Sequence, residues 1–173
     1  MTSPTVAKGA EGGSARPQAG RLPRAADVVA CRLCGGPRQR AAHFAVRRAV
    51  FVDEQALFAA DDRDERDKAP ATLHAIGLAG GRVAGAVRLY RIGAGDWKGD
   101  RLAVLPQARH GMLGARLVRF AVSTAGARGG ERMVAMIQLP NVAFFESLGW
   151  QRDGATVAFH GRPHQPMAIA LSR

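Results

Sequence analysis

A loop rich in small residues joins an apolar run to the start of a helical pattern, within residues 101–118. The first backbone N–H groups of a helix lack partners within the helix, and the helix dipole adds partial positive charge beside them. Gly111, Gly114 and Ala115 keep the side chains small here, so a phosphate oxygen can approach the backbone. Arg109 adds a full positive charge. The segment predicts a diphosphate site, although an ordinary strand-to-helix turn would use the same glycines.

Two cysteines, Cys31 and Cys34, stand three positions apart, and His43 follows them. The spacing resembles a zinc knuckle, but a structural tetrahedral site needs four ligands and no fourth is offered. A redox pair would need a βαβ setting that the surrounding pattern lacks. We therefore expect neither a metal site nor a disulfide framework.

Hydrophobic periodicity and turn residues predict an α/β domain with a largely antiparallel sheet around this loop. The turn Ala-Gly-Gly indicates a hairpin of two strands over residues 73–78 and 82–90. Asn141 is expected to cap the last helix and Gly149 to stop it. Helices are predicted at residues 38–55, 111–127 and 141–148, and further strands at 27–34, 102–105, 132–139, 155–160 and 167–171.

The chain has 173 residues, of which 47% are apolar, so it can bury the core of one domain. No apolar run reaches the roughly 20 residues of a membrane span and no signal-peptide pattern is present, so we expect a cytoplasmic protein. The net charge of +11 favours an anionic partner. It is divided into +5 over residues 1–40, zero over 41–100 and +6 over 101–173. Residues 1–27 are predicted to be a disordered basic tail, before a single domain at 28–173.

Four segments resemble the GNAT superfamily of N-acyltransferases, in the right order over residues 39–171. Residues 102–118 (LAVLPQARHGMLGARLV) look like its acyl-CoA-binding motif, Arg/Gln-x-x-Gly-x-Gly/Ala after a strand and a proline. Residues 141–150 resemble its Asn…Phe-Tyr-Glu-x-Leu-Gly-Phe segment. Residues 161–167 resemble the Gly-x-Pro-His-x-x-Met ending of some members, and residues 47–55 resemble an N-terminal helix of the same group. The nearest pattern is that of a bacterial subfamily encoded beside nitrilase-type nitrogen-scavenging enzymes.

The resemblance implies a GNAT-type fold, acyl-CoA in a V-shaped cleft between splayed strands, and direct attack of an acceptor amine on the thioester. Backbone groups at Leu102, Ala103 and Val104 would meet the pantetheine arm, with an N–H near Val104 stabilising the oxyanion. Asn141 and Phe144 would lie near the thioester and the far end of the arm. The pyrophosphate would be cradled by the amides of Arg109, His110, Gly111, Met112, Leu113, Gly114 and Ala115.

Two positions depart from the family pattern. Met112 stands where the motif has its first glycine, so the loop geometry can differ. Phe145 stands where members frequently have a general-acid tyrosine, although a CoA thiolate leaves readily without one. The pattern does not specify the base that neutralises the amine. Asp100 is the first candidate and His74 the second, and His110 stays open.

A second resemblance, within the same fold, is to acyl-homoserine-lactone synthases, which join an acyl donor to S-adenosylmethionine. It rests on Arg47, Phe51, the acidic residues Asp64 and Asp67, and Arg88. In those enzymes the acidic pair and the first arginine belong to the aminoacyl-substrate site. The two acids could hold an ammonium and either arginine a carboxylate, so an amino-acid-like acceptor is expected. The alternative is a charge-balanced surface loop, because basic residues interleave with the acids.

We therefore expect an acyl-CoA-dependent N-acyltransferase, in the first place an N-acetyltransferase, acting on a small amine. Acetyl-CoA or another acyl-CoA is the expected co-substrate, with no metal and no membrane partner, and homodimer formation stays open. The alternatives are an acyl-homoserine-lactone-synthase-like enzyme, a non-catalytic acyl-CoA-binding module and a nucleic-acid-binding module. An aromatic content of 6%, without a stacking motif, argues against nucleic acid.

Overall fold

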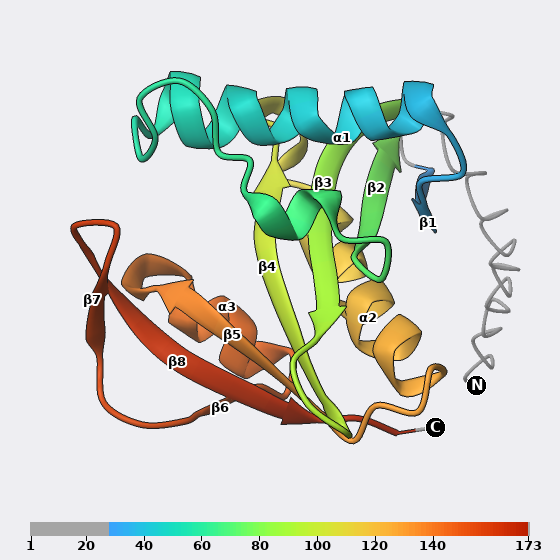
Figure 1. Ribbon diagram of the computed structural model, residues 1–173. Helices are drawn as coiled ribbons and strands as arrows, with labels where there is room; N and C mark the ends of the chain where they lie inside the picture. The colour runs from blue at the N-terminus through green and yellow to red at the C-terminus, as the bar shows by residue number, and fades with distance from the viewer. Residues whose placement is uncertain (1–27, 173) are drawn as a thin grey trace, which may run out of the picture.

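The computed structural model describes residues 28–172 (Figure 1). The predicted basic tail at residues 1–27 lies outside the described residues, as does Arg173. The described chain forms a mixed sheet in the order β1-β2-β3-β4-β5-β8-β6, with β7 paired to β8. All strand pairs are antiparallel except β4 with β5, so the predicted α/β architecture is confirmed. Among residues 28–172, no helix is both long and apolar enough to span a membrane.

Most predicted elements are present, with different ends. Strand β4 begins at Asp96 rather than Leu102, and β8 at Arg162 rather than Met167, because pairing with neighbouring strands overrides weak local patterns. The strands are β1 (Val29–Leu33), β2 (Leu73–Ala79), β3 (Arg82–Arg91), β4 (Asp96–Val104), β5 (Arg132–Gln138), β6 (Gln151–Arg152), β7 (Val157–Phe159) and β8 (Arg162–Ala170). The helices are α1 (Pro37–Arg48), continued by the π-helix η2 (Ala49–Glu54), α2 (Leu113–Gly126) and α3 (Val142–Ser147), with 3-10 turns η3 (Glu65–Lys68), η4 (Pro106–Ala108) and η5 (Leu139–Asn141).

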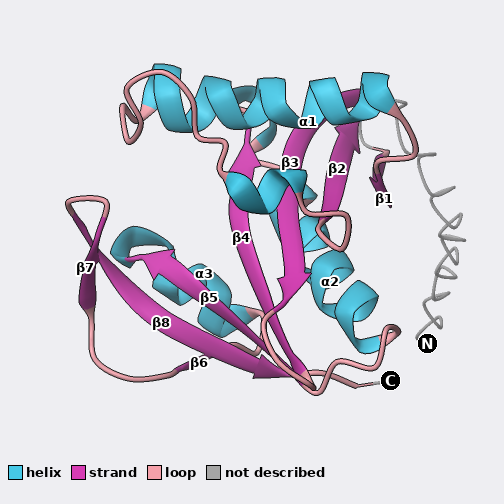
Figure 2. Ribbon diagram, viewed as in Figure 1, coloured by secondary structure: helices cyan, strands magenta, loops and turns pink. Residues whose placement is uncertain are grey.

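Helices α1 and α2 cover opposite faces of the half of the sheet formed by β1 to β4. Val46 of α1 packs in one cluster with Ala86 of β3. Leu117 of α2 packs in another cluster with Val87, the next residue of β3. Successive strand side chains point to opposite faces, so these two clusters lie on either side of the sheet. Figure 2 shows α1 across the top of this half, and α2 behind its strands.

Helix α2 lies close to the sheet because two paired glycines face it. Gly77 of β2 and Gly85 of β3 stand opposite each other in the register. A Cβ atom added to Gly77 would lie 2.6 Å from Cδ1 of Leu113, and one added to Gly85 would lie 2.6 Å from Cδ1 of Leu117. Both leucines are fully buried, so neither has room to move aside.

The central strands β4 and β5 pair only at their beginnings, through residues 96–98 and 132–134. Beyond them β4 continues beside β3 and β5 beside β8, so the two strands separate toward the top of Figure 1. Strand β4 carries a bulge here, because Arg101 and Leu102 together stand opposite Val87. Arg101 has a φ of 53°, and a bulge of this kind adds local twist.

A buried pair of imidazoles joins α1 to β2. Nδ1 of His43 lies 2.9 Å from the carbonyl oxygen of Ala75, and Nδ1 of His74 lies 3.2 Å from Nε2 of His43. Because a carbonyl can only accept, His43 carries its proton on Nδ1 and accepts from His74 through Nε2. Burial lowers the pKa of His43 to about 3 and the pKa of His74 to about 4. Both rings are therefore neutral in the folded protein near pH 7.

Filling the contact between α2 and the sheet should destabilise the protein. We expect Gly77→Val to lower the free energy of unfolding by about 1–3 kcal/mol, the usual cost of overpacking a core. Gly35→Ala is the control, because Gly35 has no positive φ and an added Cβ would make only an ordinary contact, 3.6 Å from the Gln39 side chain. Urea unfolding measures both variants. Equal stability of Gly77→Val and the wild type would contradict the tight contact.

Acid should weaken the fold within a pH window that the two histidines define. An unfolded histidine gains a proton near pH 6.5, whereas the folded rings resist protonation down to about pH 4 and 3. The unfolded state thus binds more protons in this window, so the free energy of unfolding falls as the pH drops below about 6.5. Urea unfolding between about pH 7.5 and 4.5 should show a shallower fall for His74→Gln. The exposed Gln151→Asn, which removes no titratable group, is the control and should keep the wild-type slope. An unchanged slope in His74→Gln would contradict the assignment.

Candidate active site

A cavity of about 140 Å³ lies where β4 and β5 separate. Residues 98–102 of β4 and 133–138 of β5 form two of its walls. The volume is close to that of an apolar cavity that accommodates benzene. Several of its lining residues belong to the buried core of the domain, namely Val118, Ala121, Met133, Ala135, Phe145 and Trp150. The cavity therefore reaches from the cleft into the apolar interior.

Four of the predicted site residues meet at this cavity: Phe51, Asp100, Leu102 and Asn141. Several other residues of its wall were not predicted as site residues, namely Phe58, Lys98, Arg101, Gln138, Trp150, His160 and His164. They come from segments far apart in the chain, and only the pairing of β5 with β8 and the return of the η2 loop bring them together. The His in the Gly-x-Pro-His-x-x-Met ending was the one local signal.

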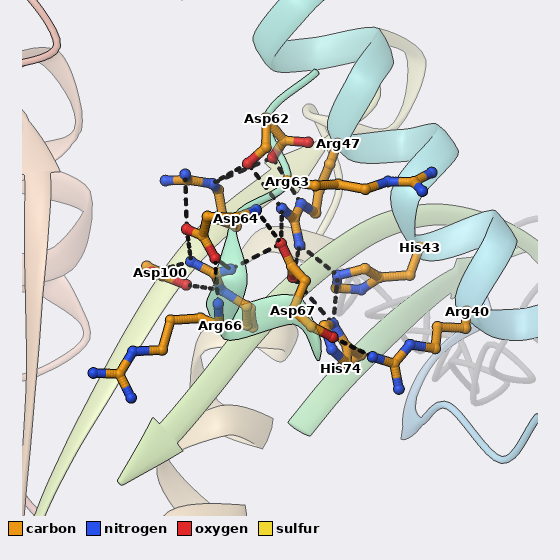
Figure 3. A network of polar contacts seen from close by, with 12 residues as sticks. Arg40, His43, Arg47, Asp62, Arg63, Asp64, Arg66, Asp67, His74 and Asp100 are labelled. Atoms are coloured by element: carbon orange, nitrogen blue, oxygen red, sulfur yellow. Dashed lines mark hydrogen bonds and ion pairs between the residues drawn. The ribbon is translucent and has the colours of Figure 1, made fainter. Parts of the chain in front are cut away.

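Asp67 lies at the centre of a buried ionic cluster beside this cavity (Figure 3). Its carboxylate accepts hydrogen bonds from Nη1 and Nη2 of Arg47, at 2.7 and 3.0 Å. Nη1 of Arg88 lies 3.0 Å from the same carboxylate. Burial alone would raise the pKa of Asp67, but the Arg47 hydrogen bonds and the nearby positive charges hold it well below its usual range. Asp67 is therefore ionised at all physiological pH values.

Arg88 connects the cluster to the cavity wall. Its guanidinium donates to Asp64 at 2.6 and 3.0 Å and to Asp100 at 2.7 and 2.8 Å. The hydroxyl of Tyr90 donates to Asp100 at 3.2 Å. Asp100, which lines the cavity, is thus held from two directions.

Two residues that were not predicted complete the cluster. Asp62 accepts from Nε of Arg47 at 2.7 Å and is 1% exposed. Arg101 lies 3.3 Å from Asp62 and 3.4 Å from Asp64, and its guanidinium stacks over the ring of Phe58. Asp61, the exposed neighbour of Asp62, is the same residue type, so the sequence carried no signal for the buried one.

The cluster differs from the expected substrate site in one respect. Arg47 and Arg88 are 0% and 1% exposed, and the protein's own carboxylates occupy both guanidinium groups. Neither guanidinium is therefore free to bind the carboxylate of a ligand, although one of the two arginines was expected to do so. Four carboxylates stand against three guanidinium groups, which leaves a formal excess of one negative charge. Asp64 and Asp100 are its partly exposed acids, at 40% and 17%.

The loop before α2 presents free backbone donors. Among the described residues, none accepts a hydrogen bond from the N–H groups of residues 110–115. The N–H of Arg109, expected in the same set, instead donates to Pro106 O at 3.3 Å within the turn η4. Phe144 of α3 and Val104 of β4 flank this helix start, 3.6 and 3.8 Å from the position of a Cβ on Gly114. Arg109 points back instead, donating to Val104 O at 2.9 Å and to Glu54 at 2.6 and 2.5 Å. Its charge is therefore balanced, which differs from the free charge expected there.

The two predicted histidines lie away from the cavity wall, whereas Phe145 and Asn141 are part of it. His74 is buried beside His43 and is not part of the cavity wall. His110 is exposed in the loop, and Phe145 stands in the wall with its ring edge-on to Trp150. Asn141 occupies the N-cap position of α3 without a side-chain capping bond. Within residues 28–172, no three His, Cys, Asp or Glu side chains gather as metal ligands do.

Comparison with known proteins gives one family and one fold. The model of the acetyltransferase (GNAT) family matches residues 40–150. Escherichia coli ElaA has a TM-score of 0.72 at 20% identity, over 82% of this chain and 99% of that one. FeeM, an N-acyl amino acid synthase from uncultured soil microbes, has 0.69 at 16%, over 83% and 90%. BjaI, a CoA-dependent acyl-homoserine lactone synthase, has 0.65 at 19%, over 79% and 78%.

These structures share the fold of the described domain, as expected for a GNAT-type sheet. The family model spans most of the domain, including α1, the α2 loop and α3. The chain is a member of the acetyltransferase (GNAT) family, the acyl-CoA-dependent N-acyltransferases.

Proposed function

We propose that the protein transfers an acyl group, in the first place acetyl, from acyl-CoA to the amine of a small, amino-acid-like acceptor. The observation that carries the proposal is the set of free N–H groups at residues 110–115, beside a cavity between separating strands. We place the reaction in the cytoplasm. We also propose that the protein belongs to the GNAT subfamily that is encoded beside nitrilase-type nitrogen-scavenging enzymes.

The residues present fit acyl-CoA. The amides of residues 110–115, at the positive end of α2, would hold the pyrophosphate, and Gly114 leaves the backbone open to it. The exposed face of Phe144 and the edge of β4 at residues 102–104 would border the pantetheine arm. Bound acyl-CoA supplies the thioester carbonyl that accepts the amine. The apolar inner wall of the cavity would exclude water from the acyl group, and its size suits groups larger than acetyl as well.

The acceptor side is supported by charge. The ionic cluster has one negative charge in excess, and Asp100 presents part of it to the cavity. Lys98 and Arg101 lie on the same wall, so the cavity presents charges of both signs, which suits the ammonium and the carboxylate of an amino-acid-like acceptor. Asp100 would therefore orient the acceptor's ammonium. Its bonds to Arg88 and Tyr90 keep its carboxylate in place and occupied, which suits an orienting group better than a base.

The alternative with a specific observation in its favour is an acyl-homoserine-lactone-synthase-like reaction. The five residues that carried that resemblance lie together, with Phe51 in the cavity wall and Arg47, Asp64, Asp67 and Arg88 in the cluster. FeeM and BjaI, which have the same fold, are an N-acyl amino acid synthase and an acyl-homoserine lactone synthase. An amino-acid-like acceptor is common to both readings.

A negative charge at the start of α2 should weaken CoA binding without harming the helix. We expect Gly114→Asp to raise the Kd for CoA at least about tenfold, because the carboxylate competes with phosphate for the same N–H groups. An acid in the first turn stabilises a helix, so the melting temperature should not fall. Gly114→Ala is the matched control and should bind CoA nearly as well, since its Cβ makes ordinary contacts. Equal Kd values for Asp and Ala, by calorimetry, would refute the phosphate assignment.

Thiol release with a panel of acceptors tests the activity itself. Acetyl-CoA and longer acyl-CoAs should release thiol with small amino-acid-like amines, and not with their hydroxy-acid analogues of the same size, which lack the amine. Reaction with S-adenosylmethionine alone would favour the synthase-like alternative. CoA binding without release from any pair would indicate a binding module and contradict the proposed transfer.

A further inference from the structure

His164 of β8 contributes a nearly buried imidazole to the cavity wall. It stands opposite Gln138 of β5 in the register, at the open end of the cleft, and both side chains line the cavity. His164 is 5% exposed, and the ring of Phe159 packs edge-on against it at 5.4 Å between centroids. Its orientation is therefore fixed by packing.

One hydrogen bond determines which nitrogen of His164 is basic. Nδ1 lies 2.9 Å from the carbonyl oxygen of Arg162. A carbonyl oxygen can only accept, so Nδ1 carries the proton and Nε2 has the free electron pair. Among the described residues Nε2 has no hydrogen-bond partner, and it is not one of the fully enclosed polar atoms. Nε2 of this nearly buried ring therefore keeps some exposure and a free lone pair, and the side chain lines the cavity.

The other candidates for a base are less suitable. Asp100 is bound by Arg88 and Tyr90. His74 donates to His43 in the interior and does not border the cavity. His160 lines the cavity, but it is exposed, and no hydrogen bond within the described residues selects its tautomer.

We propose that Nε2 of His164 is the general base that deprotonates the acceptor ammonium. The ammonium N–H bond breaks, an N–H bond forms at Nε2, and the electron pair stays on the amine, which becomes the nucleophile. The imidazolium then returns the proton to solvent through the open cleft. The other charged or titratable side chains on the cavity wall are Lys98, Asp100, Arg101 and His160. The assignment rests on the proposed function, because it requires an amine acceptor in the cavity.

His164→Asn is the decisive variant, because the asparagine amide can still donate to Arg162 O while Nε2 is lost. We expect kcat/KM to fall about 10²–10⁴-fold, the usual contribution of a general base. The acid limb of the pH profile should move to higher pH, with activity recovering only where the amine itself loses its proton. The Kd for CoA should be unchanged. Gln151→Asn, in the exposed strand β6 and outside the cavity wall, is the control and should keep the wild-type profile.

Nitrogen-15 imidazole spectra of the wild type provide a readout without turnover. They should show His164 as the Nδ1–H tautomer, with an Nε2 resonance that shifts on adding an amine acceptor and not on adding its neutral alcohol analogue. An Nε2–H tautomer, or an unchanged acid limb in an active His164→Asn, would overturn the assignment and leave the acyl transfer standing. Absence of wild-type transfer to any amine would overturn the proposed function instead.

Discussion

A single buried carboxylate, Asp67, accepts from an arginine of α1 and faces another from β3. Neither arginine reaches solvent, so both depend on the acids around them for their stabilisation. Removing one partner from a buried ion pair costs about 3–5 kcal/mol, because it strands the other charge. The cluster thereby holds α1, the η3 turn and the β3–β4 hairpin in one arrangement. It also positions Asp100, through Arg88, at the cavity wall.

The same cluster supports the distortion that shapes the cleft. Arg101 adopts a left-handed backbone conformation, which costs a non-glycine residue of order 1–3 kcal/mol. Its guanidinium lies between Asp62 and Asp64 and over Phe58, and these contacts favour the bulged strand. Strand β4 bulges here and stays paired with β3, whereas β5 stays paired with β8. The gap between β4 and β5 is lined by apolar side chains and contains the cavity. The ionic cluster and the apolar cavity therefore meet at Asp100, Arg101 and Leu102 of β4.

Local signals in the sequence predicted the elements that local physics determines. The β2–β3 hairpin follows from a Gly-Gly turn, and the start of α2 from small residues after a proline. The beginning of β4 could not be predicted, since Asp-Trp-Lys-Gly-Asp has no apolar alternation and is a strand only because β3 and β5 flank it. Asp61 and Asp62 are indistinguishable as letters, yet one is exposed and the other buried. The place of His164 likewise depends on the register between β5 and β8, which no local pattern encodes.

The closed pairing of Arg47, Asp67 and Arg88 bears on how sequences of this kind are compared. Each of these residues satisfies the others, so they can be replaced without loss only as a group. Two proteins that share all three residues therefore share the ion pairs that hold this helix against the sheet. Such agreement carries little information about the substrate that either protein acylates. Differences at positions that a ligand can touch, such as Phe58 and His160, are the ones that discriminate between substrates. A resemblance built on the braced arginines and acids is a statement about descent and architecture before it is one about chemistry.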